Sequence, residues 1–201
     1  MEQLLNLDRE LLLAANGWNS PIADKVMLFF SSIPVWIPLY LIIVALFFHP
    51  KWQTFKSEHV QRWVVGLFSV AAIAICFGLC DQISVFIKES VQRFRPGHEP
   101  ALEGMVRLLE GKGGSYGFVS SHAANTFGLA TLTALIFRKK PFSAAMFIWA
   151  AIVSYSRVYL AKHYPMDVIC GALLGILLAI AVYYLLKFTL HKYEMYRRQR
   201  A

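Results

Sequence analysis

One stretch of this chain holds three ionisable residues between two long apolar runs: Arg157, His163 and Asp167, all within eleven residues. A charged group beside the hydrocarbon of a bilayer is costly and usually marks a functional site. The carboxylate of Asp167 can bond one nitrogen of the His163 ring, fix its tautomer and leave the other nitrogen free to attack or to bind. Arg157 adds a planar cation shaped for a phosphate or a carboxylate. A polar turn between two helices at the membrane surface is the alternative for these three residues taken alone.

Pro165 predicts where the next helix begins. Proline has no backbone N–H and suits the first turn of a helix. We therefore expect a helix after Tyr164, with Asp167 in its first turn and His163 just before it.

Two further polar clusters stand next to apolar runs. The first cluster has helical spacing, with Lys88, Gln92 and Arg95 at i, i+4 and i+7. If the helix continues to Arg95, the two cations lie on one face, about two turns apart. Pro96 then disfavours further helix. Ser120, Ser121 and His122 open another apolar run, and the free N–H groups of a helix starting there would suit an anion.

The longest connection, residues 97–118, is rich in glycine. We expect a short amphipathic piece over residues 102–109, followed by a flexible glycine-rich approach to Ser120. The run from Gly111 to Ser115 lacks the spacing of a Walker nucleotide-binding loop, so it does not support nucleotide binding.

The composition is that of an integral membrane protein. Of the 201 residues 57% are hydrophobic, and the mean hydropathy is +0.50, whereas soluble domains are about 45–50% apolar. The net charge of +8 fits an anionic membrane surface, because no basic amphipathic block with interleaved aromatics indicates a nucleic-acid partner. The three cysteines lie in apolar runs without metal-ligand partners and are expected to be small core residues.

The apolar runs predict an all-α, polytopic membrane bundle forming a single domain over residues 1–201. Residues 4–15 are too short and too charged to span a bilayer and fit a helix lying in the interface. Pro34 and Pro38 should kink the first span. The five expected transmembrane helices are residues 27–48, 64–87, 120–137, 141–156 and 168–186.

Five alternating spans bring the three polar clusters to the same side of the membrane. Together they supply three cations, two imidazoles and one carboxylate. This combination is suited to a phosphate, because one histidine can attack phosphorus while the other protonates the leaving oxygen.

Three sequence motifs resemble those of the type 2 phosphatidic acid phosphatase (PAP2) superfamily. The stretch from Lys88 to Pro96 matches K-x6-R-P, and the stretch from Ser156 to Asp167 matches S-R-x5-H-x3-D. The segment 119–122 resembles P-S-G-H, with valine in place of proline and serine in place of glycine. The resemblance covers about residues 60–190, the motif-bearing core.

The resemblance implies a role for each motif residue. His163 is the expected nucleophile, which forms a phosphohistidine, Asp167 orients it, and His122 protonates the leaving group. No metal or other cofactor is implied. The expected phosphate-binding residues are Lys88, Arg95, Ser120, Ser121 and Arg157.

Four other polar residues lie outside the motif positions, and the sequence predicts only their surroundings. Arg93, His98 and Lys162 are expected to be solvated or to face lipid headgroups. Asp81 has three open alternatives: it pairs within the bundle, lines a polar cavity or caps a helix crossing.

The leading functional hypothesis is a lipid phosphatase that acts on a phosphomonoester or a terminal pyrophosphate, with membrane lipids around it and no obligate protein partner evident. Undecaprenyl pyrophosphate is the first candidate substrate, lipid A the second, and phosphatidylglycerol phosphate and phosphatidic acid follow. A non-catalytic lipid-binding protein on the same fold is a second class, against which the intact charged motifs argue. Vanadium haloperoxidases are soluble relatives of the superfamily, but they are much larger and lack spans.

Basic residues predict the orientation in the plasma (inner) membrane. With five spans, eleven of the twenty lysines and arginines fall on the side opposite the motifs. Of the nine on the motif side, three belong to the proposed pocket. Because basic loops tend to remain in the cytoplasm, the site is expected on the extracytoplasmic side. The eleven are Lys51, Lys56, Arg62, Arg138, Lys139, Lys140, Lys187, Lys192, Arg197, Arg198 and Arg200.

Overall fold

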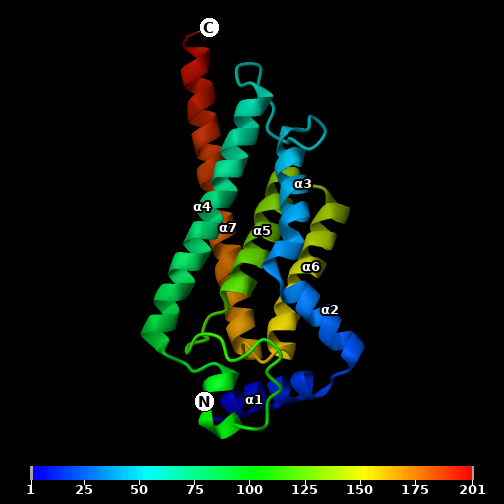
Figure 1. The fold of residues 1–201 in the computed structure, drawn as a ribbon. Helices are drawn as coiled ribbons and strands as arrows, with labels where there is room; N and C mark the ends of the chain where they lie inside the picture. Colours follow the sequence, from blue (N-terminus) through cyan, green and yellow to red (C-terminus); the bar gives the residue numbers. More distant parts are fainter. Residues whose placement is uncertain (1, 201) are drawn as a thin grey trace.

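The computed structural model describes residues 2–200 and shows a bundle of long helices with one helix lying across its end (Figure 1). Within these residues the only β pairing is an isolated antiparallel bridge between Phe94 and Tyr116. The helices are α1 (Glu2–Gly17), α2 (Pro21–Ser31), η1 (Ile33–Trp36), α3 (Ile37–Phe48), α4 (Arg62–Val91), η2 (Pro96–His98), η3 (Pro100–Leu102), α5 (Ser121–Phe137), α6 (Lys140–Tyr159) and α7 (Pro165–Arg198), where η marks a 3₁₀ helix.

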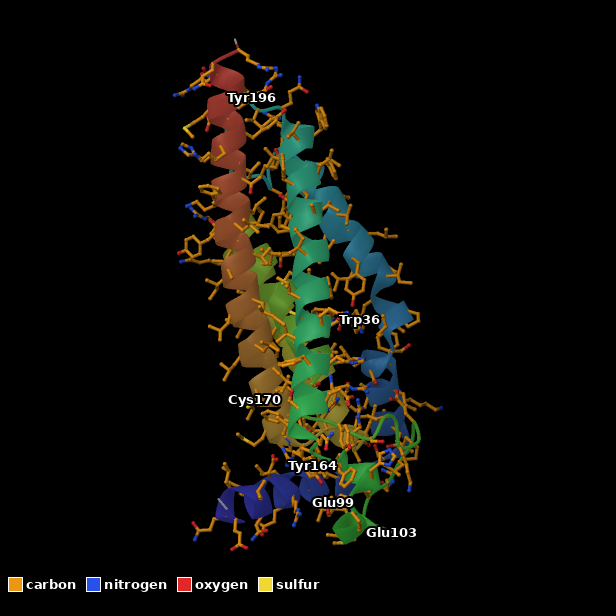
Figure 2. The ribbon with its side chains drawn as sticks, turned by 90° about the vertical axis from the view of Figure 1, so that its left-hand side faces the viewer. Trp36, Glu99, Glu103, Tyr164, Cys170 and Tyr196 are labelled. Atoms are coloured by element: carbon orange, nitrogen blue, oxygen red, sulfur yellow. The ribbon has the colours of Figure 1, made fainter. Side chains whose placement is uncertain are left out.

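The two ends of the bundle differ in what they carry. We call the end that holds α1, the loop of residues 92–120 and the turn of residues 160–164 the motif end; the opposite end, with the loop of residues 49–61 and the C-terminus, is the tail end (Figure 1). Figure 2 shows Tyr164 and Glu99 at the motif end beside α1, and Tyr196 near the far end of α7.

Helix α5 forms the centre of the bundle and packs against α4, α6 and α7. Its backbone approaches α7 most closely at Gly171 and Gly175, where an added Cβ would collide with the carbonyl oxygens of Ser120 and Ala124. Small residues permit such close helix packing in membranes. The contact fixes the start of α5 against the start of α7, so residues of two motifs become neighbours.

Large apolar side chains point outward along the bundle. Leu41 on α3, Phe86 on α4 and Leu177 on α7 are 64%, 71% and 65% exposed. Side chains of this kind are favourable where lipid tails surround a helix. The predicted all-helical membrane fold is therefore confirmed.

The number of spans can be judged from helix length and apolarity. Helices α4, α6 and α7 are each long and apolar enough to cross a membrane, and α2 with the following helices would form a fourth crossing that is bent by 68°. Helix α5 has only 17 residues, but it runs alongside α4, α6 and α7 through the middle of the bundle (Figure 1). The expected five crossings require α5 as well as these four.

The first span is not the single kinked helix predicted for residues 27–48. Helix α2 begins earlier, at Pro21, and the chain is broken at Ser32 before η1 and α3 continue it. Pro34 and Pro38 lack backbone N–H groups, which explains why a continuous helix does not form here.

The predicted continuation of α4 to Arg95 is wrong. The helix ends at Val91, and Gln92 adopts a left-handed conformation with φ of 52° while its N–H bonds to the Lys88 carbonyl at 2.9 Å. Residues 93–95 are instead held by the loop, since Arg95 N–H donates to Ser115 O at 2.9 Å. Lys88 and Arg95 therefore do not share a helix face.

The short amphipathic piece expected at residues 102–109 does not form a regular helix. Two 3₁₀ turns, η2 and η3, precede this stretch, and Gly104 has a φ of +74°, which a regular helix does not allow. At the other end of the chain, α7 continues through the predicted basic tail to Arg198.

Candidate active site

The turn that carries His163 is fixed by its own backbone. The N–H groups of Lys162 and His163 both donate to the Arg157 carbonyl, at 2.9 and 3.2 Å. Helix α7 then begins at Pro165, as predicted, and the Asp167 carboxylate accepts the N–H of Tyr164 at 3.0 Å in a capping box. The turn thus brings His163 and Asp167 together.

His163 is buried, with 2% of its surface exposed, and Asp167 is fully buried. Nδ1 of the ring faces Asp167 Oδ2 at 3.5 Å, which is longer than an ordinary hydrogen bond, and this nitrogen has no other partner. Burial lowers the pKa of His163 to about 4, although the Asp167 carboxylate opposes the shift. The ring is therefore neutral near pH 7, as a nucleophile must be.

The start of α5 contributes the second cluster. Ser120 caps the helix, its hydroxyl accepting the Ala123 N–H at 3.4 Å, and its own N–H donates to Asp167 O at 2.9 Å. The Lys88 ammonium donates to the Ser121 hydroxyl, so two motifs meet directly. His122 lies within electrostatic reach of His163 and of the three cations that the motifs supply.

The glycine-rich loop covers this site. Arg95 Nε donates to Tyr116 O at 3.0 Å, and a Cβ at Gly117 would lie 3.0 Å from Asp167 Oδ2 and 3.6 Å from His163 Nδ1. A side chain at this position would therefore crowd the Asp167 carboxylate.

Arg157 does not have a free guanidinium. One of its nitrogens donates to the Ser31 hydroxyl and lies 3.5 Å from a Glu110 carboxylate oxygen, while its Nε is buried without a partner. Lys162 lies 3.8 Å from the same Glu110 oxygen and donates to the backbone carbonyls of Glu110 and Gly111. Sequence analysis did not predict Glu110 as a member of the site.

The prediction that Lys162 and Arg93 are solvated is wrong. Lys162 is only 5% exposed. Arg93 Nη1 donates to Asp167 Oδ1 at 2.8 Å and Nη2 donates to Asp8 Oδ2 at 2.6 Å. The sequence did contain a sign that Arg93 has an acidic partner. Asp8 lies four residues from Leu12, on the buried face of α1.

The remaining polar candidates have structural partners. His98 Nε2 lies 3.0 Å from the Gly113 carbonyl within the loop. Asp81 accepts a hydrogen bond from Asn125 of α5 at 2.8 Å, so of the three alternatives it pairs within the bundle. Across residues 2–200, no three histidine, cysteine or acidic side chains are grouped so that they would hold a metal ion.

Comparison with known families identifies the class. Residues 62–190 match the sequence pattern of the PAP2 superfamily, and the chain belongs to this superfamily. The site described above therefore lies in a PAP2-type membrane lipid phosphatase.

Three curated proteins are similar to this chain over most of its length. A lipid A 4'-phosphatase of Bacteroides thetaiotaomicron is 38% identical over 178 residues, covering 87% of this chain and 75% of the relative. A lipid A 4'-phosphatase of Porphyromonas gingivalis is 33% identical, covering 91% and 74%. An undecaprenyl-diphosphatase of Sulfolobus acidocaldarius is 27% identical, covering 87% and 76%.

Two solved structures share the fold. The PAP2-type phosphatidylglycerolphosphate phosphatase of Bacillus subtilis has a TM-score of 0.65 and 25% identity, covering 96% of this chain and 88% of that one. Aquifex aeolicus LpxE has a TM-score of 0.62 and 27% identity, covering 88% and 94%.

Proposed function

We propose that this lipid phosphatase removes a phosphate from lipid A through a phosphohistidine on His163. The reaction class rests on one observation: a buried, neutral imidazole faces a carboxylate at 3.5 Å, beside the cations of the other motifs. The substrate rests on similarity to the two lipid A 4'-phosphatases.

In the first step the free nitrogen of His163, Nε2, attacks phosphorus. A P–N bond forms as the P–O bond to the sugar breaks, and His122 gives its proton to the departing oxygen. Asp167 faces Nδ1 and stabilises the positive charge that the ring acquires. In the second step His122 takes a proton from water, which attacks phosphorus and releases His163.

The phosphate is held by side chains and by the start of α5. Lys88, Arg95 and Arg157 supply positive charge, and the first turn of α5, which begins at Ser121, supplies backbone N–H groups. Arg157 must exchange the Glu110 carboxylate for the substrate phosphate. Because side-chain cations neutralise the phosphate, the mechanism requires no metal.

Undecaprenyl pyrophosphate becomes the second candidate. From the sequence alone it is the first candidate substrate, because a site on the outer side of the membrane reaches lipid carriers that remain there after they deliver their cargo. The more distant undecaprenyl-diphosphatase relative supports it, but the two lipid A relatives are more similar to this chain. Lipid A also carries phosphomonoesters on a long-chain lipid, which the same site accommodates.

A substrate panel tests the proposal. The purified protein is given lipid A, undecaprenyl pyrophosphate, phosphatidylglycerol phosphate and phosphatidic acid in one detergent, and phosphate release is measured with His163→Ala as the blank. We expect the highest kcat/KM on lipid A. A higher value on the prenyl pyrophosphate would favour the second candidate, and turnover by the blank equal to wild type would reject the mechanism.

A further inference from the structure

A chain of three charges, two of them buried carboxylates, links α1 to the proposed nucleophile. The guanidinium of Arg93 bridges two carboxylates, Asp8 on α1 at 2.6 Å and Asp167 on α7 at 2.8 Å. Its carbon atom Cζ also lies 4.0 Å from the centre of the Tyr164 ring. The two acids are 3% and 0% exposed, so this is not a surface ion pair.

Asp8 is held as firmly as Asp167. Its second oxygen, Oδ1, accepts the N–H of Met166 at 2.9 Å, in the first turn of α7. Nearby on the same face of α1, Leu12 is completely buried, and Asn16 donates to Tyr159 O at 2.7 Å. A buried carboxylate is costly unless it is paired and hydrogen-bonded, and Asp8 is both.

Arg93 determines which way the Asp167 carboxylate points. Oδ1 is occupied by Arg93 and Oδ2 accepts the Tyr164 N–H. With one donor on each oxygen, the carboxylate plane is fixed, and Oδ2 remains turned toward Nδ1 of His163. Without Arg93, only the Tyr164 N–H would restrain its rotation about the Cβ–Cγ bond.

The charge of Asp8 has its own consequence. Arg93 alone would neutralise Asp167 and weaken its pull on a positive imidazole. With Asp8 included, the three groups carry a net charge of −1, which favours the positive ring formed during phosphoryl transfer.

We propose that Asp8 and Arg93 are positioning residues for catalysis, so that α1 is part of the active-site assembly as well as an interfacial helix. The inference rests on the proposed function, because it acts through Asp167 and His163. Neither residue is proposed to touch the substrate.

The test uses Asp8→Asn and Arg93→Gln in the full-length protein, with Arg93→Lys as the conservative variant. Outer residues that orient the ligands of metal sites typically contribute about 10–100-fold, and we take this range for the residues behind Asp167. We expect kcat and the rate of phosphoenzyme formation to fall by this factor while KM changes by less than about twofold. Arg93→Lys keeps the charge but not the two-pronged geometry, so its kcat should lie between those of Arg93→Gln and wild type.

A matched control is available in the same structure. Asp24 on α2 pairs with Arg107 at 2.7 Å and accepts from the Tyr159 hydroxyl at 2.6 Å, but neither residue contacts His163 or Asp167. Asp24→Asn therefore removes a similar ion pair and should leave kcat near wild type. Thermal unfolding in detergent compares the folded state of all variants.

The decisive arm is a double-mutant cycle. If Asp8 and Arg93 act through Asp167, adding either substitution to Asp167→Asn should cost little further rate. Full additivity, or a kcat loss no larger than that of Asp24→Asn, would overturn the positioning role. If Arg93→Gln does not fold, the other two variants decide the question. A wild-type kcat in both Arg93→Lys and Asp8→Asn would also overturn the positioning role. None of these outcomes would contradict the proposed function, because a phosphohistidine could still be trapped in the wild-type protein. Turnover by His163→Ala, in contrast, would reject the proposed function itself.

Discussion

The two ends of the bundle bury polar groups of different kinds. At the motif end the buried side chains include ionisable ones, and His163, Asp167 and Lys162 are each no more than 5% exposed. At the tail end the buried Gln53 is neutral, and its amide donates to the backbone carbonyls of Phe47 and Arg62, at 2.5 and 2.8 Å.

The difference indicates that the buried polar groups of the tail end stabilise the fold, whereas those of the motif end take part in the chemistry. The neutral groups of the tail end lie beside a mostly apolar cavity of about 250 Å³ and satisfy backbone groups of the connections. At the motif end, His163 Nδ1 and Arg157 Nε are buried without any hydrogen-bond partner. A buried polar atom left unpaired costs about 1–3 kcal/mol, and within residues 2–200 such atoms also occur away from the site, at Thr131 Oγ1 and Trp149 Nε1.

The largest expected effect is at the motif end. His163→Ala should abolish phosphate release from lipid substrates and eliminate the acid-labile phosphoenzyme, because the attacking nitrogen is removed. The measurement is phosphate release together with acid-sensitive labelling by a phosphate-labelled substrate. Normal turnover by this variant would remove the chemical distinction between the two ends.

The second prediction concerns which end faces outward. A cysteine introduced at the exposed Ser115, in the loop over the site, should react with a membrane-impermeant reagent on intact cells, whereas one at Arg197 should be protected. The native Cys170 is partly exposed, so both variants are made in a background with Cys170 replaced by alanine. The reverse labelling pattern would place the motif end in the cytoplasm.

His122→Ala should have an effect that depends on the leaving group. We expect a loss of about 10²–10⁴-fold on a lipid phosphate, whose departing oxygen is strongly basic, and a much smaller loss on p-nitrophenyl phosphate. The ratio of the two kcat/KM values provides the measurement. Equal losses on both substrates would show that His122 does not protonate the leaving group.

Much of the motif end was predictable, because proline and the ends of apolar runs mark helix boundaries. Pro165 predicted the start of α7, and the run after Ser120 predicted α5. The turn at Gln92 was not predicted, since a left-handed residue other than glycine has no strong sequence signal.

The site's internal ion pairs were harder to foresee. Arg93 and Asp8 are 85 residues apart in the chain, and local periodicity cannot specify such a pairing. The only local hint was that Asp8 lies on the same face of α1 as Leu12. Glu110 gave no hint, because a loop residue has no periodic pattern.

Gln53→Ala should have the opposite effect to His163→Ala: it should lower stability and leave catalysis unchanged. Its amide donates to the carbonyls of Phe47 and Arg62, and leaving these without a donor should lower the free energy of unfolding by about 1–3 kcal/mol. We expect kcat and KM at the distant site to stay at wild-type values below the unfolding temperature. A change in kcat with unaltered stability would contradict the division of roles between the ends.

The smallest expected effect comes from Glu110→Gln. The Glu110 carboxylate lies 3.5 Å from Arg157 and 3.8 Å from Lys162, so it competes with a substrate phosphate for Arg157. Its side chain is 28% exposed, and water screens the interaction, so we expect KM to fall only a few-fold with kcat nearly unchanged. Glu103→Gln, on an exposed residue of the same loop, controls for the lost charge alone. The carboxylate is a competitor if inhibition by inorganic phosphate strengthens in Glu110→Gln and not in Glu103→Gln; if KM rises instead, Glu110 holds Arg157 in place for the substrate.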